Sequence, residues 1–133
     1  MALARNRELL LDAALVAAGG FAGAVSRALV ASTFADGPVG ITAVNVAGCG
    51  ALGFLYGRES HHHMHLRPHP KHSVFFGIGY LGAFTTFSTF TTDCIDLAEA
   101  GRGGAAAAYF AANNVGGIGA AALALKIARR ARP

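Results

Sequence analysis

Three long stretches without a charged residue constrain the fold of this chain more than any other feature. They cover residues 39–57, 73–92 and 103–125. Spanning a bilayer takes about 20 mostly apolar residues in an α-helix, so each stretch is long enough to cross. A fourth candidate, residues 9–33, is interrupted by Asp12 near its start and Arg27 near its end. We therefore predict a single all-α membrane domain over residues 1–133, with four transmembrane helices at about 9–33, 39–57, 73–92 and 103–127.

The composition and the start of the chain agree with a membrane protein. Only 14% of the residues are charged, whereas a soluble domain carries about 25%. The first stretch follows two arginines, Arg5 and Arg7, as a secretory signal peptide would. Glu8 and Asp12 fit poorly beside the apolar core of a signal peptide, and three further spans follow. We expect a retained first helix, with cleavage as the alternative.

All six histidines lie in one loop, residues 58–72. His61 and His65 would share a metal ion if this segment were helical. A His-rich composition alone is a weak indicator of metal binding, so we predict a solvated cytoplasmic loop instead. The two cysteines, Cys49 and Cys94, fall in separate predicted helices. Their placement indicates neither a disulfide framework nor a zinc site.

The distribution of basic residues predicts the orientation. Four spans place both termini and the loop 58–72 on one side of the membrane, while Arg102 lies on the other, with Arg27 nearer to it. Loops on the cytoplasmic side carry an excess of Lys and Arg, so we predict cytoplasmic termini in a plasma (inner) membrane protein. The basic residues on the predicted cytoplasmic side are Arg5, Arg7, Arg58, Arg67, Lys71, Lys126, Arg129, Arg130 and Arg132.

The polar residues inside the predicted spans are neutral. No Asp, Glu, Lys or His lies near the middle of any span. A proton-coupled carrier generally needs a titratable group there, so the pattern favours passive movement. Hydrogen bonds between helices are the alternative role for these side chains. The neutral polar set is Asn45, Thr85, Thr86, Ser88, Thr89, Thr91, Thr92, Tyr109, Asn113 and Asn114.

Spacing brings some of these residues together. Phe87 and Phe90 are three apart, and Tyr109 and Asn113 are four apart, so each pair shares a helix face. The edge of a phenyl ring is electropositive, so two rings that present their edges to a narrow path would stabilise a small anion. Packing in the core or against lipid remains the alternative role for the rings.

The stretch "GYLGAFTTF" predicts a break in the third helix. Gly79 and Gly82 weaken the helix, and the hydroxyls of Thr85 and Thr86 compete for backbone partners. An unwound turn there would free carbonyl oxygens at the depth of the membrane. In other membrane proteins, such carbonyls hold Na⁺.

Three motifs give the chain a close resemblance to the Fluc/CrcB family of fluoride channels. They are "GGFAGAVSR" (19–27), "VNVAGCGALG" (44–53) and above all "GAFTTFSTFTTD" (82–93). The resemblance covers all four spans in order. It implies a passive exporter of cytoplasmic fluoride that assembles as an antiparallel dimer around a structural Na⁺.

The resemblance also implies roles for individual residues. The carbonyls of Gly82 and Thr85 would bind the Na⁺, and Arg27 matches an arginine at the end of the first helix, with a structural or gating role. The residues expected along the fluoride pathway are Asn45, Phe87, Ser88, Phe90, Tyr109 and Asn113. Asn113 and Gly117 stand where the family usually has hydroxyl residues in the fourth helix. The row of polar side chains expected along this helix therefore differs from the family's at these two positions.

Other functions remain as alternatives. A small four-helix multidrug exporter has a similar length, but it would need a carboxylate buried in the membrane. A membrane scaffold that transports nothing is the second alternative. We expect no enzyme, because Ser88 has no histidine within a span to activate it. The strong charge bias also predicts one orientation, so an oppositely oriented paralogue is the expected partner in an antiparallel dimer.

Overall fold

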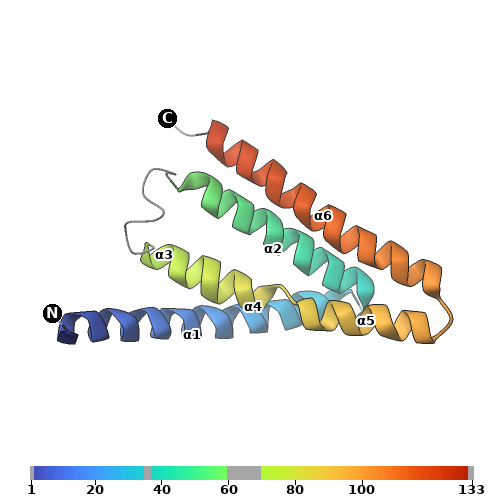
Figure 1. Ribbon diagram of the computed structural model, residues 1–133, viewed down its shortest axis with the longest axis horizontal. Helices are drawn as coiled ribbons and strands as arrows, with labels where there is room; N and C mark the ends of the chain where they lie inside the picture. The colour runs from blue at the N-terminus through green and yellow to red at the C-terminus, as the bar shows by residue number, and fades with distance from the viewer. Residues whose placement is uncertain (1, 35–36, 60–69, 132–133) are drawn as a thin grey trace.

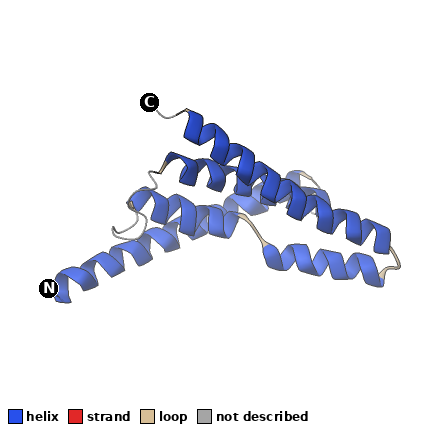
Figure 2. Ribbon diagram, turned by 45° about the horizontal axis from the view of Figure 1, so that its top comes forward, coloured by secondary structure: helices blue, strands red, loops and turns tan. Residues whose placement is uncertain are grey.

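The structure is a computed structural model that describes residues 2–34, 37–59 and 70–131, and these residues are almost entirely helical. Figure 1 shows the long helices lying side by side as an elongated bundle, and Figure 2 shows helices and no strand among the described residues. The elements in chain order are α1 (Ala2–Thr33), α2 (Pro38–Arg58), α3 (Lys71–Ser73), the π-helical η2 (Val74–Leu81), α4 (Gly82–Phe84), α5 (Phe87–Glu99) and α6 (Gly103–Arg130).

Four helical segments of the described chain are long and apolar enough to cross a membrane. They are Arg5–Thr33, Pro38–Arg58, Lys71–Glu99 and Gly103–Arg130. The predicted all-α class with four potential membrane spans is therefore confirmed. Large apolar side chains on every one of these segments are exposed, for example Phe21, Phe54, Phe76 and Ile118. Soluble proteins rarely expose so much contiguous apolar surface, whereas helices that face lipid do.

The third span consists of several pieces joined end to end. The rod formed by α3, η2 and α4 ends at Phe84, and α5 begins at Phe87. Between them, Thr85 (φ −78°, ψ 155°) and Thr86 (φ −142°, ψ 123°) adopt extended backbone conformations. Thr86 caps α5, because its Oγ1 accepts a hydrogen bond from the backbone N–H of Thr89 at 3.2 Å.

Glycines allow α1 to lie directly against η2 (Figure 1). A Cβ atom placed on Gly79 would lie 2.9 Å from the carbonyl oxygen of Val16 and 3.1 Å from the Cα of Gly19. A Cβ on Gly19 or Gly23 would likewise clash with the η2 backbone. Small residues at four-residue spacing permit this close approach of helices in lipid.

The second main contact joins α2 and α6, again through small residues. A Cβ atom on Gly53 would clash with the backbone of Ala121, and one on Gly57 would lie 2.6 Å from the Cβ of Ala128. The bundle therefore consists of two pairs, α1 with η2 and α2 with α6. The third span passes from the first pair to the second at Thr85 and Thr86, and its last part, α5, lies against α6.

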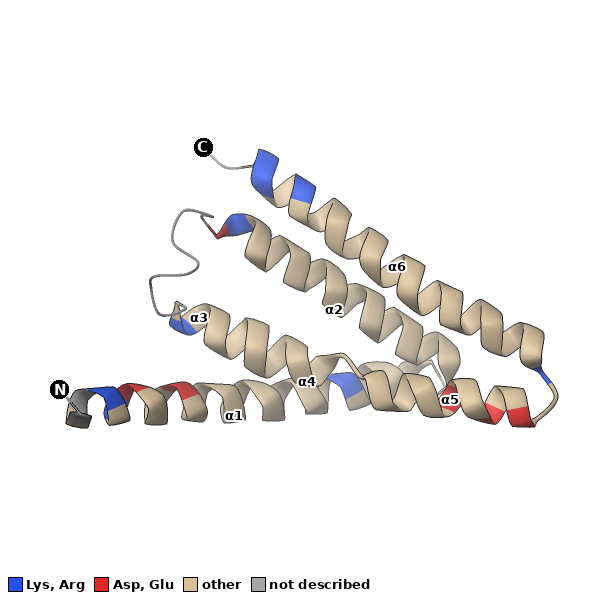
Figure 3. Cartoon of the chain, in the orientation of Figure 1, with Lys and Arg blue, Asp and Glu red and all other residues tan. Residues whose placement is uncertain are grey.

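Charged residues gather at the ends of the helices, as Figure 3 shows. Blue Lys and Arg positions cluster where α1 begins, where α2 and α6 end, and at α3. Lys71 Nζ pairs there with Glu8 Oε2 at 2.8 Å and with Asp12 Oδ1 at 2.7 Å, which fastens the start of the third span to α1. The predicted loop with His61 and His65 falls mostly outside the described residues.

Candidate functional site

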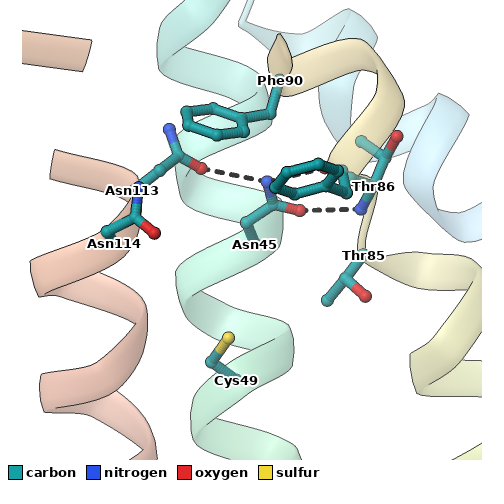
Figure 4. Close-up of a pocket in the computed structure, with 8 residues that line it drawn as sticks. Asn45, Cys49, Thr85, Thr86, Phe90, Asn113 and Asn114 are labelled. Carbon is teal, nitrogen blue, oxygen red and sulfur yellow. Dashed lines mark hydrogen bonds between the residues drawn. The ribbon is translucent and has the colours of Figure 1, made fainter. Parts of the chain in front are cut away.

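A small uncharged pocket lies where α2, α5 and α6 meet, next to the two extended threonines (Figure 4). Its volume is about 200 Å³. One water molecule takes about 30 Å³ in the liquid, so the pocket has room for a few waters or a partly hydrated small ion. All of its lining residues are uncharged: Asn45, Cys49, Thr85, Thr86, Phe87, Phe90, Asn113 and Asn114.

A chain of amide hydrogen bonds crosses the pocket. Asn45 Oδ1 accepts from the backbone N–H of Thr86 at 2.8 Å, and Asn45 Nδ2 donates to the Thr86 carbonyl at 3.0 Å. The same Nδ2 donates to Asn113 Oδ1 at 3.0 Å, and Asn113 Nδ2 donates to Thr42 Oγ1 at 2.9 Å. These bonds fasten the extended segment to α2 and α2 to α6, as Figure 4 shows for Asn45.

The two predicted phenylalanines share the pocket but differ in burial. Phe90 is 3% exposed, whereas Phe87 is 76% exposed. Their ring centroids lie 5.8 Å apart. The Phe90 ring also makes an edge contact with the Tyr109 ring at 5.3 Å. One ring is therefore held rigidly inside the chain, and the other lies at its surface.

Four of the other residues expected at the site do not line the pocket. Ser88 Oγ lies 3.3 Å from Thr86 Oγ1, on the first turn of α5. Tyr109 lies behind Phe90 and donates its hydroxyl to Asp93 Oδ2 at 3.0 Å. Gly82 is exposed at the start of α4, and Arg27 is half-buried on α1.

The residues expected at the fluoride pathway and the sodium site did not include three that line the pocket: Thr86, Cys49 and Asn114. Cys49 lies four residues after Asn45, so their shared helix face was a signal that could have identified it. Thr86 was visible as a polar residue within a span, but its backbone contacts depend on the packing of α2. Asn114 directly follows Asn113, and neighbours in a helix normally point in different directions.

The backbone around the extended segment departs from α-helical pairing at two carbonyls. In an α-helix, the N–H of residue 86 would donate to the carbonyl of Gly82, and that of residue 89 to the carbonyl of Thr85. Here the Thr86 N–H donates to Asn45 Oδ1, and the Thr89 N–H donates to Thr86 Oγ1. The amides that would normally bond the Gly82 and Thr85 carbonyls are thus used elsewhere.

Comparison with protein families decides what kind of chain this is. The family model described as "CrcB-like protein, Camphor Resistance (CrcB)" matches residues 14–125, which is most of the sequence. The chain belongs to the CrcB family. The resemblance read from the three motifs is confirmed, and with four helices able to cross a membrane this CrcB-family chain is a multi-pass membrane protein.

Curated relatives agree with this assignment over part of the chain. A protein named "Fluoride-specific ion channel FluC 2" from Methanosarcina acetivorans is 43% identical over 73 residues, 54% of each chain. Its namesake from Methanosarcina mazei is 42% identical over 73 residues, also 54% of each chain. A third, from Thermobifida fusca, is 39% identical over 77 residues, 55% of each chain. The aligned part therefore spans about half the length of these curated relatives.

Proposed function

We propose that this chain forms a fluoride-specific ion channel that passively exports cytoplasmic fluoride and so reduces its toxicity. The observation that carries the proposal is the uncharged pocket, lined by two phenyl rings and by amide and hydroxyl groups, in a chain of the CrcB family. The relatives with which it aligns are named as fluoride-specific channels. Fluoride efflux from liposomes that contain the purified chain and its partner tests the proposal directly.

The chemistry of the pocket suits a small anion. The edges of Phe87 and Phe90 carry partial positive charge, and a ring edge attracts an anion without the trapping strength of a full charge. Conduction requires binding that is favourable enough for entry and weak enough for release. Since no Asp, Glu, His, Lys or Arg lines the pocket, movement follows the fluoride gradient and needs no proton coupling.

An antiparallel dimer would complete the pathway. Phe87 forms part of the pocket wall yet is 76% exposed in the single chain. A second subunit packed against this side would cover the ring and close the pathway laterally against lipid. Ser88, also exposed and on the first turn of α5, would then line the path between subunits.

A structural Na⁺ at the dimer interface fits the backbone of the break in the third span. The carbonyls of Gly82 and Thr85 would bind it, because the amides that would occupy them in an α-helix bond to Asn45 and Thr86 instead. Carbonyl oxygens are suitable ligands for a hard cation. The ion's role is to neutralise and order these dipoles where two subunits meet.

The orientation proposed is cytoplasmic N- and C-termini in the plasma (inner) membrane. The cluster of Lys and Arg at the end that holds the start of α1 and the end of α6 supports it. A chain with this bias inserts in one direction, whereas an antiparallel dimer needs both. We therefore include an oppositely oriented paralogue as the partner, and fluoride conduction by the purified chain alone would refute that part.

The liposome assay also separates the alternative functions. Vesicles loaded with fluoride should release it when the chain and its partner are present, whereas a scaffold leaves them intact. A multidrug exporter would instead move organic cations in response to a proton gradient. Retention of fluoride equal to that of empty vesicles, with both chains inserted, overturns the proposed function.

A further inference from the structure

The side-chain amide of Asn45 is fully engaged by the protein itself. A primary amide offers two N–H donors and one carbonyl oxygen. Both donors are used, one by the Thr86 carbonyl and one by Asn113 Oδ1, each at 3.0 Å. The oxygen accepts from the Thr86 N–H at 2.8 Å. An anion is bound by donors, and in this arrangement Asn45 has none to spare (Figure 4).

Thr86 is the residue that depends on these bonds. Its backbone is extended, and the residue is only 6% exposed. Because its N–H does not pair within a helix, Asn45 Oδ1 replaces the missing helical acceptor. An amide group has the donor and acceptor of a peptide unit, so Asn45 pairs with Thr86 as a residue of a neighbouring antiparallel strand would. Without Asn45, the buried N–H of Thr86 would lack a hydrogen-bond acceptor, because the interior of a lipid bilayer supplies none.

We propose that Asn45 is a positioning residue that holds Thr86 extended and thereby fixes where α5 begins. The first residue of α5 is Phe87, and Phe90 lies one turn further, so the placement of both rings follows from that of Thr86. The bond between Asn113 Nδ2 and Thr42 Oγ1 orients Asn113, whose Oδ1 in turn orients Asn45. The consequence for transport rests on the proposed function, whereas the brace itself does not.

The test measures exchange of the Thr86 backbone amide by NMR in the full-length, ¹⁵N-labelled chain in detergent, without fluoride. Asn45→Leu keeps a branched side chain of similar size but removes every hydrogen bond. Asn45→Asp keeps an acceptor for the Thr86 N–H. Asn114→Leu is the matched control, since Asn114 lines the same pocket but donates to Phe110 O on its own helix.

We expect Thr86 to exchange about tenfold faster or more in Asn45→Leu, since a buried donor loses its acceptor. Exchange at Thr86 should stay unchanged in Asn114→Leu. In Asn45→Asp it should accelerate less than in Asn45→Leu, because the acceptor for the Thr86 N–H is kept while the two bonds donated by Nδ2 are lost. Amides in the middle of α6 should not change in any variant, which separates a local brace from general loss of stability. If Asn45→Leu fails to fold while Asn45→Asp folds, the acceptor is what folding requires, and the proposal stands.

Two outcomes overturn the proposal: unchanged Thr86 exchange in Asn45→Leu, or equal acceleration in the Leu and Asp variants. Neither outcome bears on fluoride conduction, because the exchange experiment contains no fluoride. Conversely, a chain with a protected Thr86 that releases no fluoride from liposomes, with its partner also inserted, contradicts the proposed function and leaves the brace intact. The two experiments together therefore show which statement has failed.

Discussion

The two halves of the third span, η2 and α5, pack in different ways. In η2, Gly77 and Gly79 are buried and the helix lies against α1, with little room at Gly79 for a side chain. In α5, which contains no glycine, the Phe87 and Phe90 side chains line a pocket shared with α2 and α6. In η2, the absence of side chains at the glycines lets the helix lie close to α1. In α5, side chains form part of the wall of the pocket.

The extended pair Thr85 and Thr86 allows this difference. Both ends of a continuous straight helix would pack against the same neighbouring helix. The change in backbone direction lets η2 pack on α1 while α5 packs on α6. The packing against α1 and the pocket therefore involve different halves of one span. Substitutions in η2 should mainly affect folding, and substitutions in α5 should mainly affect the pocket.

The largest effect is expected in the anchoring half. Gly79→Leu would force a side chain into the backbone of α1, because even a Cβ would lie 2.9 Å from Val16 O. Overpacking of this kind costs up to about 3 kcal/mol, and rigid backbone on the opposite side gives little relief. The yield of folded protein by size-exclusion chromatography should fall sharply. Gly104→Leu, where a Cβ would meet nothing within 4 Å, is the control; equal yields would remove the anchoring role.

The next effect concerns the segment between the halves. Replacing Na⁺ by a large organic cation during purification should weaken the dimer if the Gly82 and Thr85 carbonyls hold the ion. With Na⁺ at a hundred times its Kd, the loss amounts to about 2.7 kcal/mol. Subunit exchange between differently labelled dimers measures it. A dimer whose stability is the same in both salts contradicts the proposed ion site.

A smaller effect is expected for the ring that lies inside the pocket. Phe90→Ile retains bulk but removes the ring edge, and aromatic interactions of this kind are worth about 1 kcal/mol. Fluoride flux should fall roughly fivefold, since tenfold in rate would correspond to about 1.4 kcal/mol. Phe76→Ile on η2 is the matched control, because that ring lies outside the pocket. Equal flux in the two variants would remove the ring mechanism.

The smallest effect tests the support behind that ring. Tyr109→Phe keeps the ring contact with Phe90 and removes only the hydroxyl that donates to Asp93. The net worth of one hydrogen bond is about 1 kcal/mol, so we expect a modest drop in the free energy of unfolding and a small drop in flux. Tyr80→Phe on η2 provides the comparison by thermal denaturation; a larger effect there would contradict the division between the halves.

Much of the architecture follows from the sequence because lipid imposes simple constraints. Charge-free runs of bilayer length predict four spanning helices, and the structure has four suitable segments. The helix ends differ in detail: the third potential span continues to Glu99, beyond the charge-free run, because α5 does not stop at Asp93. Asp93 is accommodated there by the Tyr109 hydroxyl, a partner on another helix.

The site was predicted less completely, because it depends on contacts between distant segments. The motifs identified Asn45, Phe87 and Phe90, and the row of polar side chains expected along the fourth helix gave Asn113. The structure brings all four to one pocket. The bond from Thr86 to Asn45 joins the extended segment to α2, and helical spacing within one element does not predict it. The roles of the predicted site residues remain predictions until flux is measured.

The pairing of α1 with η2 has a consequence for biosynthesis. Since α2 precedes η2 in the chain, the glycine face of α1 waits uncovered while α2 enters the bilayer. The first helix is therefore made before η2, the element against which its glycines pack, and these small residues have other neighbours during that interval. A crowded membrane thus offers competing partners until Val74–Leu81 has been made.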